Sequence, residues 1–197
     1  MVKPQLGETL FKENENSKAN VIMRRWGIIT NYARGYLLAG NLLVNEIIKN
    51  PKDADKLIYP MIFNYRQALE LSLKNAILIG SQVEGEMNVQ FGHELQDLWQ
   101  VCRPYLEVQL KEASETLEAV TSIIAQFAQN DNKSIKYRYP IKGKRENHTA
   151  EATFEKGTPL DYRNFAKVSQ DVILYINECE NKLTGMLEDR WAENFGN

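Results

Sequence analysis

Residues 59–78 read YPMIFNYRQALELSLKNAIL, and the architecture of the chain can be worked out from this stretch. Its apolar residues recur at steps of three and four, which predicts an amphipathic helix. The stretch also places Arg66, Glu70 and Lys74 in one row, because residues four apart lie on one helix face. At about 100° per residue, that row falls among large apolar side chains. We therefore expect three ionisable groups to point into a helical core.

Charges on an apolar face must be paired, or must meet a partner that arrives from outside. Three interpretations are open for the row: a solvated face with helix ion pairs, a buried structural network, or a functional polar centre that binds phosphate. His93 follows in GHELQDLW (92–99), at the expected start of the next helix. Its imidazole is either satisfied by nearby backbone or acidic groups, or acts as a general acid or base beside the row.

Helical periodicity continues on both sides of the row. Gly80 and Ser81 are expected to end the second helix, Pro104 to kink or split the third, and Thr158 to cap the last. The pattern predicts an all-α, up-and-down bundle of about five long helices. The expected helices are 20–49, 53–79, 93–103, 113–128 and 158–191.

A small β-hairpin insertion is expected near 134–155. Residues 134–141, SIKYRYPI, alternate and are rich in Tyr and Ile, which is typical of a short strand. KGKRENH (142–148) then reads as a turn, and ATFEKG (152–157) as the returning strand. Such a two-stranded hairpin must lean on the helices, because it is marginally stable alone.

Positive charge gathers between residues 133 and 148, where Glu146 is the only acid. Tyr137 and Tyr139 interleave with the cations, an arrangement that suits RNA phosphates and base stacking. The alternative is an exposed hairpin kept soluble by its lysines. Arg138, between the two tyrosines, is the cation expected to turn inward. The six cations are Lys133, Lys136, Arg138, Lys142, Lys144 and Arg145.

Composition indicates one soluble domain. The chain has 197 residues, 43% hydrophobic and 25% charged, which is ordinary for a globular protein. Residues 1–19 are polar and are expected to form a flexible N-terminal arm before a single domain over 20–197. No stretch has the length of a signal peptide core or a membrane span, so we expect a cytoplasmic protein without a membrane partner. The net charge of −2 argues against a surface that coats nucleic acid as a whole.

The reactive residue types are sparse. Cys102 and Cys179 sit in helical patterns and are expected to be reduced core thiols. His93 and His148 are isolated from each other and from any thiol, so neither a metal site nor a cofactor is expected. The sequence has no Gly-rich phosphate loop, no nucleophile elbow and no paired-carboxylate motif.

Three motifs in order carry a family resemblance: YRQALELSLK (65–74), GHEL (92–95) and YRYP (137–140). With them the chain resembles the HEPN superfamily (higher eukaryotes and prokaryotes nucleotide-binding) over roughly residues 20–190. The resemblance implies a helical bundle, often dimeric, in toxin–antitoxin, antiphage or other stress systems. Many members are metal-independent RNases, and others bind nucleotides or are inactive structural partners.

Active HEPN RNases usually carry an arginine, four to six residues, and then a histidine. No arginine has that spacing before His93, and Lys142 stands at the matching place before His148. We therefore expect a non-catalytic, HEPN-like homodimer that binds a nucleotide or RNA at the basic hairpin, or a partner protein. One alternative is a metal-independent endoribonuclease, in which His93 or His148 is the acid or base and Arg138 or Arg66 stabilises the phosphate. A second alternative is a dimeric structural scaffold.

Overall fold

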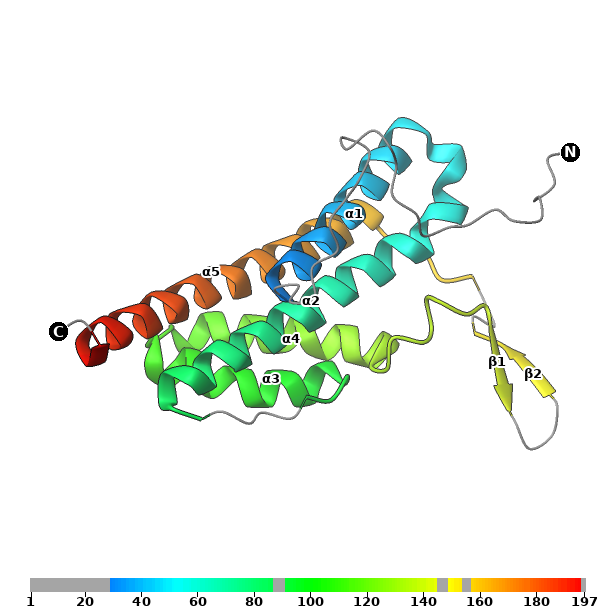
Figure 1. The fold of residues 1–197 in the computed structure, drawn as a ribbon. Coiled ribbons are helices and arrows are strands. Elements are labelled where there is room, and N and C mark those ends of the chain that lie inside the picture. Colours follow the sequence, from blue (N-terminus) through cyan, green and yellow to red (C-terminus); the bar gives the residue numbers. More distant parts are fainter. Residues whose placement is uncertain (1–28, 87–90, 145–148, 154–156, 196–197) are drawn as a thin grey trace, which may run out of the picture.

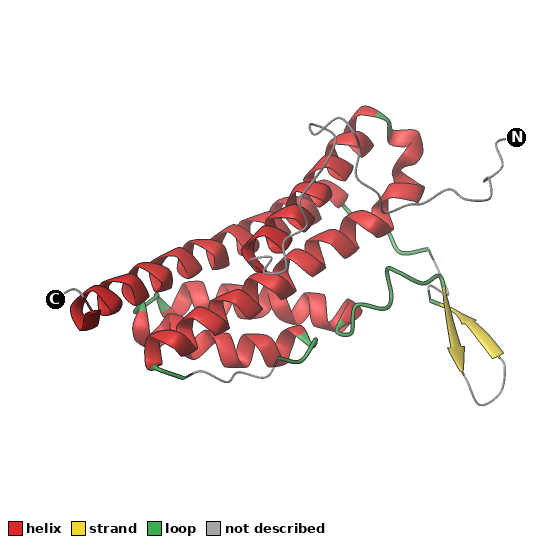
Figure 2. Cartoon of the chain, viewed as in Figure 1, coloured by secondary structure: helices red, strands yellow, loops and turns green. Residues whose placement is uncertain are grey.

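The computed structural model describes residues 29–86, 91–144, 149–153 and 157–195, which form a bundle of long helices (Figure 1). The predicted all-helical bundle is confirmed, and the coloured cartoon shows how little other structure the described residues contain (Figure 2). The arm expected over residues 1–19 lies outside the described residues. The helices are α1 (Ile29–Lys49), the 3₁₀ turn η2 (Pro51–Asp53), α2 (Ala54–Glu84), α3 (Leu95–Pro104), the π-helical turn η3 (Tyr105–Gln109), α4 (Ser114–Asp131) and α5 (Tyr162–Phe195).

Helix α2 lies at the centre of the bundle, packed along α1 and α5 and against α3 (Figure 1). Its apolar side chains are enclosed, with Leu69, Leu73 and Ile77 all at 0% exposure. A helix buried on several sides carries its polar residues into the interior with it. The position of α2 therefore decides where the charged row lies.

Helix α1 ends before Pro51 as predicted, and Asn50 has a non-helical backbone with φ of −129° and ψ of 76°. The predicted end of α2 at Gly80 is wrong, since the helix continues to Glu84. Gly80 is instead a packing residue: a Cβ there would lie 2.6 Å from Cγ of Tyr105. The residue that ends α2 is Gly85, whose φ of 86° is left-handed.

The starts of two helices also differ from the prediction. Helix α3 begins at Leu95, so His93 lies in the loop before it. Helix α5 begins at Tyr162 rather than Thr158. Oδ1 of Asp161 accepts the backbone N–H groups of Arg163 and Asn164, at 3.1 and 3.0 Å, and so satisfies the first turn.

The strand predicted over residues 134–141 is wrong, because residues 134–140 form turns. Oδ1 of Asp131 accepts the N–H groups of Ile135 and Lys136, and this local bonding replaces a strand ladder. The strands begin later: β1 (Ile141–Lys144) pairs antiparallel with β2 (Thr149–Ala152). This pair stands beyond the end of the bundle (Figure 1).

The two cysteines lie in the core, as predicted. Cys102 on α3 and Cys179 on α5 are buried and have free thiols. Burial raises the pKa of both thiols, that of Cys179 to about 11. Both side chains therefore remain protonated at neutral pH and behave as small apolar groups.

Candidate functional site

The charged row of α2 points into the molecule, which confirms the expectation from its helical position. Arg66 is 1% exposed and Glu70 is 3% exposed. The side chain of Lys74, at the outer end of the row, is 12% exposed. Of the three interpretations, the solvated face is therefore excluded.

The carboxylate of Glu70 is the hub of this row. Oε2 accepts Nη1 of Arg66 at 2.6 Å, and Oε1 accepts Nζ of Lys74 at 2.8 Å. Nδ1 of His93 lies 3.0 Å from the same Oε1. Burial by itself raises the pKa of Glu70, but the bonds from Lys74, Arg66 and His93 outweigh it, so the pKa lies below its ordinary value. Glu70 is thus a fixed anion.

The other donors of Arg66 bind main-chain carbonyls. Nε donates to the carbonyl of Asp131 at 2.9 Å, and Nη2 donates to those of His93 at 2.9 Å and Asn132 at 2.5 Å. Two of these carbonyls lie at the C-terminal end of α4, where a cation is stabilised by the helix dipole. Arg66 thus joins α2 to the end of α4 and to the loop before α3. We call Arg66, Glu70, Lys74 and His93 the Glu70 centre.

His93 is the exposed member of the Glu70 centre. Its side chain is 79% exposed, while Nδ1 lies 3.0 Å from Glu70 and 3.3 Å from Nζ of Lys74. Because a carboxylate only accepts, we assign the ring proton to Nδ1. A neutral ring then keeps Nε2 as an acceptor. The arrangement orients an accessible imidazole, which is one element of general acid–base chemistry.

Arg138 does not turn inward as predicted. It is exposed, and its guanidinium lies over the rings of Tyr139 and Phe63, with 5.2 and 5.8 Å to the centroids. Its Nε donates to the carbonyl of Ser134. The turn at Ser134, with φ of 57°, brings this carbonyl back toward the arginine, so local backbone bonding holds Arg138 at the surface.

Of the remaining predicted site residues, the structure describes the side chains of the two tyrosines and not those of the hairpin cations. Tyr137 is half-buried, and Nζ of Lys136 lies 5.9 Å from its ring centroid, whereas Tyr139 is 51% exposed. Burial raises the pKa of Tyr137. The backbones of Lys142 and Lys144 belong to β1. The side chains of Lys142 and Lys144, together with Arg145 and His148, lie outside the described residues.

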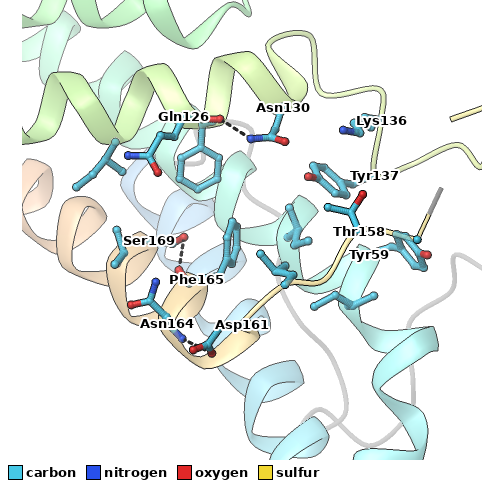
Figure 3. A pocket seen from close by; sticks show the side chains of 17 residues that line it. Tyr59, Gln126, Asn130, Lys136, Tyr137, Thr158, Asp161, Asn164, Phe165 and Ser169 are labelled. Atoms are coloured by element: carbon cyan, nitrogen blue, oxygen red, sulfur yellow. Dashed lines mark hydrogen bonds between the residues drawn. The ribbon is translucent and has the colours of Figure 1, made fainter. Parts of the chain in front are cut away.

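A cavity of about 650 Å³ between α2, α4 and α5 was not predicted (Figure 3). Its lining combines an apolar wall with amide side chains from α4 and α5. The sequence signal was the pair Phe127 and Phe165, each on the apolar stripe of its helix, with amides beside them. The stripes do not reveal that α4 and α5 face each other here. The described lining residues are Ile58, Tyr59, Ile62, Ile123, Gln126, Phe127, Asn130, Lys136, Tyr137, Gly157, Thr158, Leu160, Asp161, Asn164, Phe165, Val168 and Ser169.

The described residues offer neither a cluster of metal ligands nor a helix that could span a membrane. No group of three or more His, Cys, Asp or Glu side chains there is arranged to hold a metal ion. Among the helices described, none combines the length and apolar character needed to cross a membrane.

No protein-family model matches the chain, and neither a curated protein nor a solved structure matches it. The HEPN resemblance therefore stays a prediction, carried by the three motifs of the sequence.

Proposed function

We propose that the chain is a HEPN-like module that binds single-stranded RNA without cleaving it. The binding surface is the Arg138 segment, which we define as residues 133–139. One observation carries the proposal: an exposed arginine stacked on an exposed tyrosine, Arg138 on Tyr139, at the edge of the bundle. Cations with aromatic rings between them are the usual means of binding a single strand.

The chemistry of the segment suits both parts of a nucleotide. The ring of Tyr139 has Arg138 over it and remains 51% exposed, so a base can stack on the accessible part. The side chain of Lys133 is 70% exposed, although Nζ lies 3.6 Å from Glu94. Lys133 and Arg138 place positive charge where the phosphates of a stacked strand would run.

The bonding within the Glu70 centre favours a structural role for its residues over a catalytic one. Four of the five N–H groups of Arg66 are bonded to protein oxygens, and both carboxylate oxygens of Glu70 are occupied. An arginine that stabilises a phosphate in a transition state must offer it free donors. Arg66 offers at most one, so we assign the centre a structural role.

The experiment compares two pairs of residues, each of them an arginine followed directly by an aromatic residue. The double variant Arg138→Ala/Tyr139→Ala removes the stack. Arg190→Ala/Trp191→Ala removes an exposed arginine and aromatic residue near the far end of α5, where Nη1 of Arg190 donates to the carbonyl of Val83. The readout is fluorescence anisotropy of a labelled single-stranded RNA across a salt series. We expect the first variant to lose about tenfold in affinity, with a shallower salt dependence, and the second to bind like the parent chain. Equal affinities for both variants would refute the proposal.

A second candidate function, a metal-independent endoribonuclease, is favoured by the exposed imidazole of His93 that Glu70 orients. It predicts RNA cleavage in EDTA that is lost in His93→Ala and kept in Gln96→Ala, a nearby exposed position on α3. His148→Ala tests the other histidine. Cleavage that survives both histidine substitutions would exclude these residues as the acid and base.

The HEPN resemblance extends the proposal to the setting of the module. We propose a homodimer that acts in a bacterial defence, toxin–antitoxin or stress system, with a partner protein as an alternative ligand. Mass measurement in solution tests the dimer. A monomeric mass at micromolar concentration would remove the dimer from the proposal.

A further inference from the structure

The wall of the α4–α5 cavity is apolar, aromatic and fixed in shape. The rings of Phe127 and Phe165 meet edge to face, with centroids 5.5 Å apart and 64° between their planes. Phe165 also meets Tyr65 at 6.1 Å and 74°, so its ring is held from two sides. Branched aliphatic side chains such as Ile62 and Val168 continue the wall. Such a wall suits the flat face of a planar ring.

The polar groups of the cavity include three side-chain amides beside hydroxyl groups. Gln126 and Asn130 come from α4, and Asn164 comes from α5 on the opposite side (Figure 3). Nδ2 of Asn130 donates to the carbonyl of Gln126 at 2.9 Å, and Nε2 of Gln126 donates to that of Ser122 at 3.3 Å. These bonds use amide nitrogens and leave the amide oxygens as acceptors. The edge of a ligand that carries N–H donors would complement them.

The described lining carries one charge of each sign. Asp161, the only carboxylate among the described lining residues, caps the first turn of α5 through Oδ1. Lys136, the only cation among them, lies over the ring of Tyr137 at 5.9 Å. An uncharged ring can lie on the apolar wall without the desolvation cost that an ion would meet there.

We propose that the cavity binds a planar, uncharged nitrogen heterocycle with an exocyclic amino group, the chemistry of adenine. A volume of about 650 Å³ is within the range of small-molecule sites. Two sources supply such a ring: a free nucleoside and an unstacked base of an RNA strand. The second source rests on the proposed function, because Tyr137 lines the cavity and directly precedes Arg138 and Tyr139.

The first arm of the test uses free nucleosides and the full chain. Adenosine and purine riboside differ only in the exocyclic amino group, so titration calorimetry should give about tenfold tighter binding of adenosine. Val168→Trp fills the cavity, and Val101→Trp makes the same change at an exposed position on α3. We expect Val168→Trp to abolish adenosine binding and Val101→Trp to keep it.

The second arm uses a single-stranded RNA that carries one 2-aminopurine, whose fluorescence changes when the base leaves the stack of its RNA neighbours for another environment. A change that appears with the parent chain and Val101→Trp, but not with Val168→Trp, assigns the cavity to an RNA base. Adenosine binding without such a change assigns it to a free nucleoside. If Val168→Trp and Val101→Trp behave alike in both arms, the inference is overturned.

A milder substitution keeps the test valid if Val168→Trp does not fold. Gln126→Met removes an amide at an exposed position of the rim, and Gln96→Met makes the same change on α3. The preference for adenosine over purine riboside should shrink in Gln126→Met and not in Gln96→Met. An unchanged preference in Gln126→Met would contradict the inference. The variant Arg138→Ala/Tyr139→Ala separates the two proposals: we expect it to bind adenosine normally, whatever it does to RNA affinity.

Discussion

The Glu70 centre and the α4–α5 cavity use polar groups in opposite ways. In the centre, each ionisable side chain is bonded to another part of the protein, and Glu70 alone accepts from three residues. In the cavity, the polar groups include the amides of Gln126 and Asn130, whose oxygens are left as acceptors beside an aromatic wall. Charges buried in an apolar stripe must be satisfied by the fold itself. Arg66 and Glu70, the most conspicuous polar residues of the sequence, thus connect α2 to the neighbouring segments of the fold.

The largest expected effect comes from breaking the centre. Glu70→Gln leaves the charges of Arg66 and Lys74 without their anion, and should lower the free energy of unfolding by about 3–5 kcal/mol. Chemical denaturation measures it. The matched change Glu118→Gln affects a carboxylate that is 62% exposed, and should have no measurable effect. Equal losses in both variants would show that Glu70 is not a hub.

A second prediction concerns the packing of α2 near its C-terminal end. Gly80→Ala would place a methyl group 2.6 Å from Cγ of Tyr105, and should cost about 1–3 kcal/mol of unfolding free energy. Gly35→Ala in α1 meets nothing within 4 Å and should instead stabilise the chain by about 0.5–1 kcal/mol. Thermal and chemical denaturation of both variants check the signs. A stabilised Gly80→Ala protein would contradict the close packing.

The centre should also give the protein part of its acid sensitivity. The pKa of Glu70 is lower in the folded chain than its ordinary value of 4.5. Its contribution to stability is therefore full above the unfolded pKa and is lost as the pH falls through the folded pKa. The difference in unfolding free energy between the parent chain and Glu70→Gln should shrink from neutral pH to about pH 3. A difference that stays constant would show that the pKa is not lowered.

The smallest effect is expected at Tyr65, whose hydroxyl donates to Oδ1 of Asn41 at 2.6 Å. Tyr65→Phe should cost about 0.5–1.5 kcal/mol at neutral pH. Burial raises the pKa of Tyr65 to about 12, so the stability tied to its protonated state is full below the ordinary pKa of 10.0 and is lost as pH rises toward 12. Urea titrations of both proteins at neutral and alkaline pH measure this. A gap between them that widens with pH would contradict the burial of the phenol.

The sequence predicted those features that depend on one helix alone. The inward row of Arg66, Glu70 and Lys74 follows from helical spacing, and the end of α1 follows from Pro51. The carbonyl partners of Arg66 could not be predicted, because they depend on where α4 ends in space. For the same reason the cavity was missed, since its wall forms only when α4 and α5 face each other.

Local competition explains the error in residues 134–140. Their alternating pattern is typical of a strand, but the side chain of Asp131 binds the N–H groups of Ile135 and Lys136 and favours a turn. Ser134 follows with a positive φ. The guanidinium of Arg138 accordingly lies over the ring of Tyr139 next to these turns and not in a strand.

The central claim is that the Glu70 centre stabilises the fold, whereas the proposed RNA binding depends on the Arg138 segment. The most direct measurement is RNA affinity beside unfolding free energy for Lys74→Met and for Arg138→Ala/Tyr139→Ala. We predict that Lys74→Met lowers the unfolding free energy and leaves RNA affinity unchanged. The double variant should lose RNA affinity and keep its unfolding free energy. A folded Lys74→Met protein that loses RNA affinity as strongly as the double variant would contradict the claim.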